Sequence, residues 1–270
     1  MPPVFPFADI ALARRLELTE GRGNAAFVDA QARRDPNSGA IWKVIGGTYA
    51  MFAGVGSPIT QTFGLGVHAP LLETDLESIE RFFTSRGSAV FHELCPLAGI
   101  DVPQALVKRG YRPVELSAVL FQPIDASTRV AANPNVHVRQ AGRDEAASYA
   151  KVAARGWSEH PETMPYIEGF ATLSLDCAMC FVAEQDGRPI ATAALFMYER
   201  TALLAGASTV PEGRRQGAQN ALLDTRLRTA ASNGCDLAMM VAAPGSASQR
   251  NAERQGFRIA YTRTKWQLDA

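Results

Sequence analysis

One order of sequence signals occurs twice along the chain, and this repeat limits the fold more than any other feature. In each half a helix-like segment ends at a glycine, an apolar run ends at a proline, and a Gly-aromatic-Arg segment leads into a strand-like run. The glycines Gly87 and Gly234 lie 147 positions apart, and Gly110 and Gly256 lie 146 apart. This nearly constant offset predicts two similar α/β halves. The alternative, that two unrelated α/β units share this common order, stays open.

The second half has the clearer pattern of strands and helices. Its periodicity and turn residues predict the order β-α-(α)-β-β-β-α-β-α-β, which is typical of a mixed sheet with helices on its faces. The predicted elements are strands 136–140, 178–184, 189–197, 202–210, 237–243 and 259–266, and helices 144–157 and 218–232.

Composition and charge narrow the class of protein. The 270 residues are 47% hydrophobic, which excludes wholesale disorder. Lys+Arg and Asp+Glu both number 27, so the chain has no global attraction for nucleic acid or anionic lipid. Four cysteines are too few for a disulfide framework, and neither a signal peptide nor an apolar run of about 20 residues occurs. We therefore expect a cytoplasmic protein.

The segment between the predicted strand ending at Val210 and the predicted helix from Ala218 contains two glycines and the pair Arg214-Arg215. Backbone N–H groups, a helix N-terminus and two guanidinium groups together suit a phosphate or pyrophosphate. The segment lacks both the Gly-Lys-Ser/Thr of nucleoside-triphosphate loops and the G-x-G-x-x-G of dinucleotide folds. A solvated basic turn is the alternative interpretation.

In this context the segment resembles the acyl-CoA pyrophosphate loop of the GNAT (Gcn5-related N-acetyltransferase) superfamily, whose pattern is Gln/Arg-x-x-Gly-x-Gly/Ala. Arg214 takes the first position and Gly217 the fourth, whereas Gln219 stands where the family usually has Gly or Ala. Gly256-Phe257 is similar to the end of the family's Tyr-x-x-x-Gly-Phe segment, but Ala252 takes the tyrosine position. The resemblance covers roughly residue 136 to the C-terminus.

The resemblance implies an α/β (α+β) fold of two GNAT-like domains, each a mixed, mostly antiparallel sheet flanked by helices. We predict a degenerate domain at 1–125, a linker at 126–134 and an acyltransferase domain at 135–270. In the first half the matching loop, 64–70, leads into an acidic helix with Glu73, Asp75, Glu77 and Glu80. Carboxylates there would repel a pyrophosphate, so we expect this half not to bind CoA in the usual way.

The resemblance also implies the reaction: an amine attacks acetyl-CoA, the co-substrate, directly, and the protein mainly orients the reactants. Backbone groups near Ser208, Thr209 and Val210 are expected to hold the pantetheine arm. The remaining predicted CoA-binding residues are Arg214, Arg215, Gln216, Gly217, Ala218, Gln219 and Asn251.

Catalytic groups are harder to assign, because Ala252 removes the family's usual general acid. Ser248, Ser246 or a bound water could replace this acid, of which we name Ser248, and His160 and Glu199 are candidate bases. A helix cap is the preferred interpretation of Ser246. His92-Glu93 is a further candidate only if its strand faces the cleft. The lone pair Cys177 and Cys180 lacks a second ligand pair, so we expect no metal site.

Three functions remain in competition. The first is N-acyl transfer to a small-molecule or amino-acid-like amine, and the second is a non-catalytic acyl-CoA sensor or scaffold, which Gln219 and Ala252 favour. The third, an aminoacyl-tRNA-dependent transferase, is disfavoured by the zero net charge. We expect no nucleic-acid or membrane partner, and a homodimer stays open.

Overall fold

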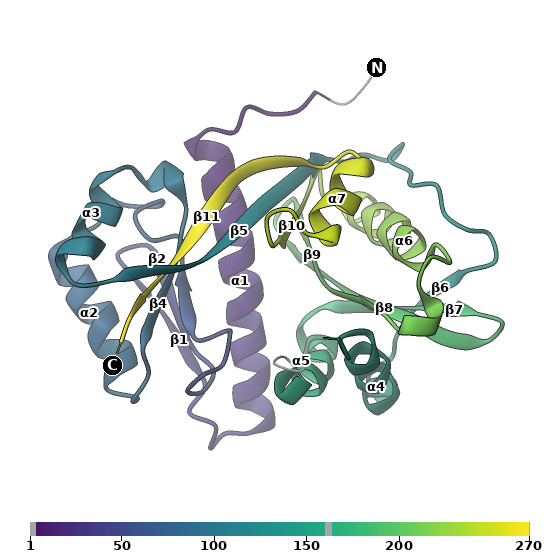
Figure 1. Cartoon of the computed structure of the whole chain (residues 1–270), viewed down its shortest axis with the longest axis horizontal. Helices are drawn as coiled ribbons and strands as arrows, with labels where there is room; N and C mark the ends of the chain where they lie inside the picture. The colour runs from purple at the N-terminus through teal and green to yellow at the C-terminus, as the bar shows by residue number, and fades with distance from the viewer. Residues whose placement is uncertain (1–3, 160–163, 270) are drawn as a thin grey trace. The chain divides into compact units, whose positions relative to one another are not determined.

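The computed structural model describes residues 4–159 and 164–269. The chain forms two compact units (Figure 1). We call Pro123–Met240 the central unit, and Val4–Gln122 together with Val241–Ala270 the flanking unit.

The flanking unit begins with the long helix α1 and carries six strands in the order β1-β2-β3-β4-β11-β5. Within this set β3 and β4 run parallel, and the other neighbouring pairs run antiparallel. Its elements are α1 (Ile10–Arg34), β1 (Ile41–Ile45), β2 (Thr48–Phe52), β3 (Gln61–Phe63), α2 (Glu73–Thr84), β4 (Val90–Leu94), α3 (Asp101–Lys108), β5 (Arg112–Pro123), α7 (Ala247–Arg254) and β11 (Arg258–Leu268).

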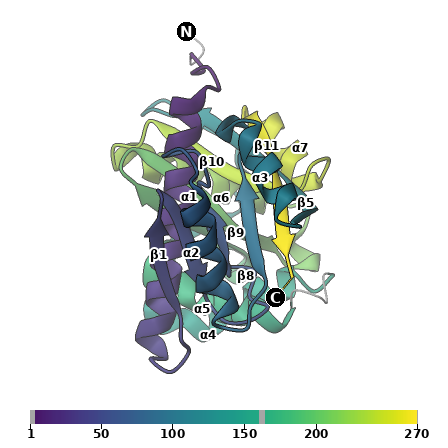
Figure 2. The same cartoon turned by 90° about the vertical axis from the view of Figure 1, so that its left-hand side faces the viewer.

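Helices cover both faces of this sheet. Tyr49 and Met51 of β2 pack in one cluster with Ala25 and Val28 of α1. The intervening residue Ala50 packs in another cluster, with α2 and α3. Successive side chains of a strand point to opposite faces, which explains why all five residues of β2 are buried. Figures 1 and 2 show these strands between α2 and α1.

The central unit carries five strands in the order β10-β9-β8-β7-β6, with β9 and β10 parallel and the other pairs antiparallel. Tyr149 and Ala153 of α4 and Leu175 of α5 pack on β7 and β8 in one cluster, and α6 packs against strands of the same sheet. Its elements are β6 (His137–Gln140), α4 (Ala146–Gly156), α5 (Met164–Cys177), β7 (Met179–Gln185), β8 (Arg188–Tyr198), β9 (Thr201–Thr209), α6 (Ala218–Ser232) and β10 (Leu237–Ala242).

The predicted repeat and fold class are confirmed. Each half contains three successive strands, a helix, a strand that pairs in parallel with the third, a short helix and a final long strand. The structure therefore has the mixed α/β architecture, with mostly antiparallel pairing and flanking helices, that the sequence predicts.

The compact units differ from the predicted domain limits at the C-terminal end. β11, the last strand of the second repeat, pairs with β4 through Thr264–Leu268 and with β5 along most of its length. Backbone hydrogen bonds thus join the last segment to the first half, so residues 241–270 belong to the flanking unit rather than to a domain at 135–270.

The predicted linker 126–134 lies against α6. The Val130 N–H donates to Asp224 Oδ1 at 2.9 Å, and Asn220 Nδ2 donates to the Ala131 carbonyl at 3.1 Å. Asn133 Nδ2 donates to the Gln216 carbonyl at 2.8 Å. The segment is thus tied to the helix that follows the predicted phosphate loop.

Candidate functional site

The predicted phosphate loop joins the end of β9 to the start of α6 and turns twice through left-handed backbone. Arg215 has φ +60° and Gly217, the N-cap of α6, has φ +83°. A Cβ atom on Gly217 would lie 2.9 Å from Asn133 Cβ, which is too close. Both the backbone conformation and the close approach of Asn133 therefore require glycine at this position.

The N-terminus of α6 is open. Its first backbone hydrogen bond runs from the Ala221 N–H to the Gly217 carbonyl, at 3.1 Å. Helix geometry leaves the N–H groups of Ala218 and Gln219 without intrahelical acceptors, and the N-cap has no side chain to supply one. Donors and the positive end of the helix dipole thus meet at one point, the arrangement that binds phosphate.

Gln219 takes the position where a small residue was expected. Its Nε2 donates to Thr209 Oγ1 at 2.7 Å, so the side chain is held on the end of β9. The larger residue therefore links the start of α6 to the strand that precedes the loop.

Two arginines next to the loop, Arg214 and Arg155, form ion pairs with nearby carboxylates. Arg214 Nη1 lies 2.6 Å from Glu159 Oε1, and Arg155 pairs with Glu212. An incoming pyrophosphate would compete with Glu159 for Arg214. The charge at the loop is cationic but partly neutralised in this structure.

β9 carries a β-bulge that the sequence analysis did not predict. Thr192 pairs with Ser208 and Ala194 with Ala205, so Gly206 and Ala207 together oppose one residue of β8. Gly206 has φ +59°, and Ala205–Ala207 are exposed within an otherwise mostly buried strand. The signal available in the sequence was a glycine inside a strand-like run.

The same stretch of β9 lies beyond its parallel pairing with β10. The paired residues of the two strands end at Leu203 and Met239, whereas β9 continues to Thr209. The exposed residues Ala205–Ala207 are therefore separated from the loop at the start of α6 by Ser208, Thr209 and Val210.

Ser208–Val210, the stretch predicted to bind the pantetheine arm, already makes hydrogen bonds within the protein. The Val210 N–H donates to the Ile190 carbonyl and its own carbonyl accepts from Gly213, so both backbone groups already bind within the protein. Ser208 is buried, and its hydroxyl bonds the Ala153 carbonyl at 3.2 Å. The exposed residues of β9 lie earlier, at the bulge, Ala205–Ala207.

Comparisons with known proteins agree with this geometry. Residues 145–257 match the sequence model of the acetyltransferase (GNAT) family. Residues 145–257 belong to the GNAT family. No protein with a curated description matches it.

Solved structures show the GNAT fold over nearly the whole chain. A GCN5-related N-acetyltransferase from Kribbella flavida is 19% identical with a TM-score of 0.64, covering 93% of this chain and 95% of its own. One from Sphaerobacter thermophilus is 15% identical with a TM-score of 0.55, covering 99% and 94%. A tandem GNAT protein from the clavulanic acid biosynthesis pathway is 11% identical with a TM-score of 0.59, covering 90% and 87%.

The predicted catalytic residues Glu199, His160 and Ser248 stay predictions. Glu199 lies in the turn between β8 and β9, about six residues or roughly 20 Å along β9 from the bulge. His160 lies outside the described residues. Ser248 and Asn251 are exposed on α7, which belongs to the flanking unit, and they stay predictions.

Ser246 is the N-cap of α7, and its hydroxyl accepts from the Gln249 N–H at 3.2 Å. The expectation of a structural cap is confirmed.

His92 and Glu93 are buried in the flanking unit. His92 Nδ1 lies 2.7 Å from Thr62 Oγ1 across the parallel pair β3–β4, and burial lowers the pKa of His92 to about 3. Glu93 lies 3.5 Å from Arg263, which is 1% exposed and also binds Glu20 at 2.8 Å. These side chains fill the interior beside β3 and β4, so His92 and Glu93 have structural roles.

The start of α2, the counterpart of α6, is occupied. Asp75 in its first turn accepts from the Leu72 N–H, and the Asp75 carboxylate lies directly against Gly46 in the β1–β2 turn. Arg109 binds the acidic face through Glu80 at 2.8 Å. Carboxylates and a neighbouring turn therefore stand where the other half presents its open helix N-terminus.

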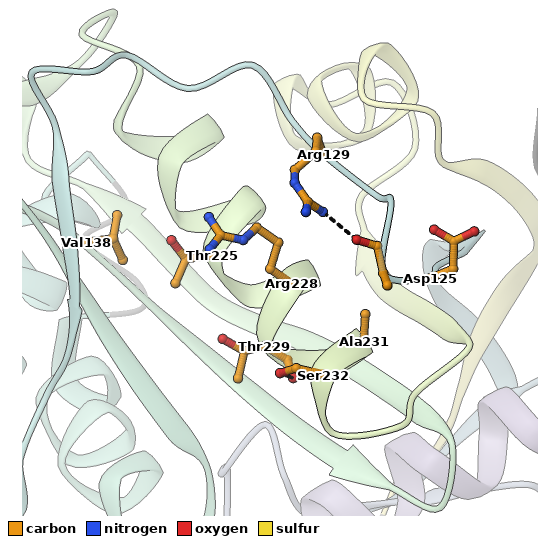
Figure 3. A pocket seen from close by; sticks show the side chains of 9 residues that line it. Asp125, Arg129, Val138, Thr225, Arg228, Thr229, Ala231 and Ser232 are labelled. Atoms are coloured by element: carbon orange, nitrogen blue, oxygen red, sulfur yellow. Dashed lines mark hydrogen bonds between the residues drawn. The ribbon is translucent and has the colours of Figure 1, made fainter.

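A surface pocket of about 460 Å³ lies between the segment after β5 and the second half of α6 (Figure 3). It contains none of the predicted site residues. Its two arginines are already hydrogen bonded, Arg129 to the carbonyls of Ala126 and Thr128 and Arg228 to Asp224.

Within the described residues, no group of three or more His, Cys, Asp and Glu side chains is arranged to hold a metal ion. Cys177 ends α5, and Cys180 lies buried on β7. None of the helices in the described ranges is long and apolar enough to cross a membrane.

Proposed function

We propose that this GNAT protein is an acyl-CoA-dependent N-acyltransferase that uses acetyl-CoA as co-substrate. The open, glycine-capped start of α6 beside the exposed bulge of β9 is the observation that carries the proposal. The acceptor is the amine of a small-molecule or amino-acid-like compound.

The residues at the loop fit a pyrophosphate. Gly217 gives the loop the left-handed turn that starts α6, and the N–H groups of Ala218 and Gln219 point along the helix axis toward the loop. Arg214 and Arg215 add positive charge. The exposed backbone at Ala205–Ala207 is the part of β9 that would receive the thioester carbonyl and donate to it as negative charge develops.

The acceptor nitrogen forms a bond to the thioester carbon, the carbon–sulfur bond breaks, and CoA leaves as the thiolate. Ala252, which is 3% exposed, has no proton to give. We assign protonation of the thiolate, and removal of the proton from the acceptor amine, to solvent. The protein then contributes orientation and stabilisation of the oxyanion.

A non-catalytic acyl-CoA sensor is the second candidate. Ala252 and the Glu159–Arg214 ion pair favour it, because the first removes the family's acid and the second competes with the cofactor.

Thermal-shift titration with acetyl-CoA and with CoA tests both candidates, since a ligand that binds the native state raises the unfolding midpoint. We expect a midpoint that rises with either ligand. No rise at ligand concentrations well above micromolar would sink both functions. A thiol-release assay over a panel of amines then separates them, because a sensor binds acetyl-CoA and releases no thiol.

A further inference from the structure

Arg226 lies in the middle of α6 with its side chain directed into the core of the central unit. It is 4% exposed. Its Nε donates to the Leu222 carbonyl at 3.2 Å, and its Nη1 lies 3.2 Å from the Ala194 carbonyl and 3.5 Å from that of Ala205. A buried guanidinium thus reaches across to two strands.

The acceptors of Arg226 are unusual for a buried cation. Throughout the described ranges of the chain, no carboxylate forms an ion pair with it, and backbone carbonyl oxygens receive its hydrogen bonds instead. Burial lowers the pKa of its guanidinium to about 10, which leaves the group charged at neutral pH. Removing a charge from water is costly, so a hydrophobic residue here would be the cheaper choice for stability alone.

Ala194 and Ala205 are the residues at which the β8–β9 register shifts. A bulge disrupts the hydrogen-bond ladder and leaves backbone groups in need of other partners. Arg226 satisfies two carbonyls at this position from inside the unit. The next residues, Gly206 and Ala207, are exposed.

The chemistry of one peptide group links Arg226 to the exposed backbone. The Ala205 carbonyl and the Gly206 N–H belong to the same peptide unit. Donation to the carbonyl polarises that unit and strengthens its N–H as a donor, by about 10–30% per bond in condensed-phase estimates. A positive charge held at the carbonyl therefore acts on the amide at the bulge.

We propose that Arg226 is a positioning residue that fixes the β9 bulge and polarises the 205–206 peptide, so that the bulge binds the thioester carbonyl. The inference rests on the proposed acyltransferase function and names the residue that organises its oxyanion contact. Arg226 itself does not touch the substrate.

The test compares Arg226→Lys and Arg226→Met with the control Arg228→Met. Arg228 lies two residues further along α6, is exposed and plays no part in the proposed site. For both Arg226 variants we expect kcat for thiol release to fall at least about tenfold, approaching the loss seen when an oxyanion donor is removed. The KM for acetyl-CoA should change less than about threefold, because the pyrophosphate contacts are untouched. Arg228→Met should match the wild type.

A second measurement needs no acceptor and remains usable if Arg226→Met does not fold. In ¹⁵N-glycine-labelled protein, the Gly206 amide resonance, assigned as the one missing from Gly206→Ala, should shift between the CoA and acetyl-CoA complexes. In Arg226→Lys that difference should shrink. An unchanged difference, or equal kcat values for the Arg226 and Arg228 variants, would overturn the positioning role. Wild-type protein that fails to bind acetyl-CoA would instead refute the proposed function itself.

Discussion

Both halves of the chain contain two parallel strands joined through a helix, β3-α2-β4 and β9-α6-β10. The surroundings of the two strand pairs differ, because side chains bond across the first pair and the second has exposed residues. In the central unit, β9 continues past its last residue paired with β10, carries an exposed bulge and leads into the glycine-capped start of α6. In the flanking unit, Thr62 and His92 bond across β3 and β4, and carboxylates stand at the start of α2. The same repeated fold therefore has an uncapped helix start in one half and a helix start occupied by carboxylates in the other.

The two units also treat a buried arginine differently. Arg263 binds the carboxylates of Glu17, Glu20 and Glu93, whereas Arg226 binds main-chain carbonyls. The ion pairs of Arg263 lie in the buried interior of the flanking unit, whereas the hydrogen bonds of Arg226 reach the strand residues at the β9 bulge. Four variants, each with a control, test these differences between the two units.

The largest expected effect is a change with pH in the free energy of unfolding, caused by Glu17 in the interior of the flanking unit. Burial raises the pKa of Glu17 to about 7, against the opposing charge of Arg263. Because the native state then binds a proton that the unfolded state has lost, the stabilising contribution is full below about pH 4.5 and is lost as the pH rises through 7. From the shift of the pKa, the free energy of unfolding should fall by on the order of 3 kcal/mol across this window.

Glu17→Gln should remove that slope. Urea denaturation of both proteins between pH 5 and 8 measures the difference, and Glu115→Gln, which alters an exposed carboxylate, is the control. Parallel stability curves for wild type and Glu17→Gln would refute the buried titration.

The next effect separates the two glycine loops. Gly217→Val places a β-branched side chain at φ +83° and against Asn133, which should weaken acetyl-CoA binding about 10- to 100-fold through strain of roughly 1–3 kcal/mol. Gly64→Val, at φ +77° in the flanking loop, introduces similar strain beside His68. It should lower the unfolding midpoint without changing acetyl-CoA affinity. Equal losses of affinity, measured by calorimetry, would contradict a single binding half.

A smaller effect on acetyl-CoA affinity is expected from the charge of Arg214. Arg214→Ala should weaken acetyl-CoA binding about tenfold, the value of one charge-assisted hydrogen bond to phosphate. Arg200→Ala removes another arginine that pairs with a carboxylate, Asp236, in the turn region at the far end of β9. Calorimetric affinities that fall equally for both variants would show that Arg214 has no special role.

The smallest effect tests the competing carboxylate. Glu159→Gln frees Arg214 and should strengthen acetyl-CoA binding about two- to fivefold, since exposed ion pairs are worth about 0.2–1 kcal/mol. Glu212→Gln, which breaks the neighbouring pair with Arg155, should leave the affinity unchanged. Weaker binding by Glu159→Gln would mean that Glu159 positions Arg214 rather than restrains it.

Local patterns predict the elements well, because each depends on neighbouring residues. The predicted helix 218–232 coincides with α6, and the glycine spacing correctly identifies the repeat. By contrast, the sequence pattern predicts no element over α1. Its apolar period is weak, and it buries Glu17 and Glu20, which only the distant Arg263 makes favourable.

The candidate site was predicted at the loop and missed at the bulge. Arg214 and Gly217 belong to a short local pattern, and these residue types alone predict a phosphate-binding loop. The bulge and Arg226 are not, because the register of β8 and β9 and the burial of a helix residue depend on the packed sheet. The strand partners of β11 likewise depend on tertiary pairing.

The position of β11 has a consequence for synthesis. β4 and β5 emerge from the ribosome well over one hundred residues before the strand that lies between them. At roughly 5–20 residues per second, their unpaired edges wait several seconds or longer while the central unit is made. Exposed strand edges are templates for aggregation. Residues 123–240 therefore have time to fold before the sheet of the first half is completed by β11, Arg258–Leu268.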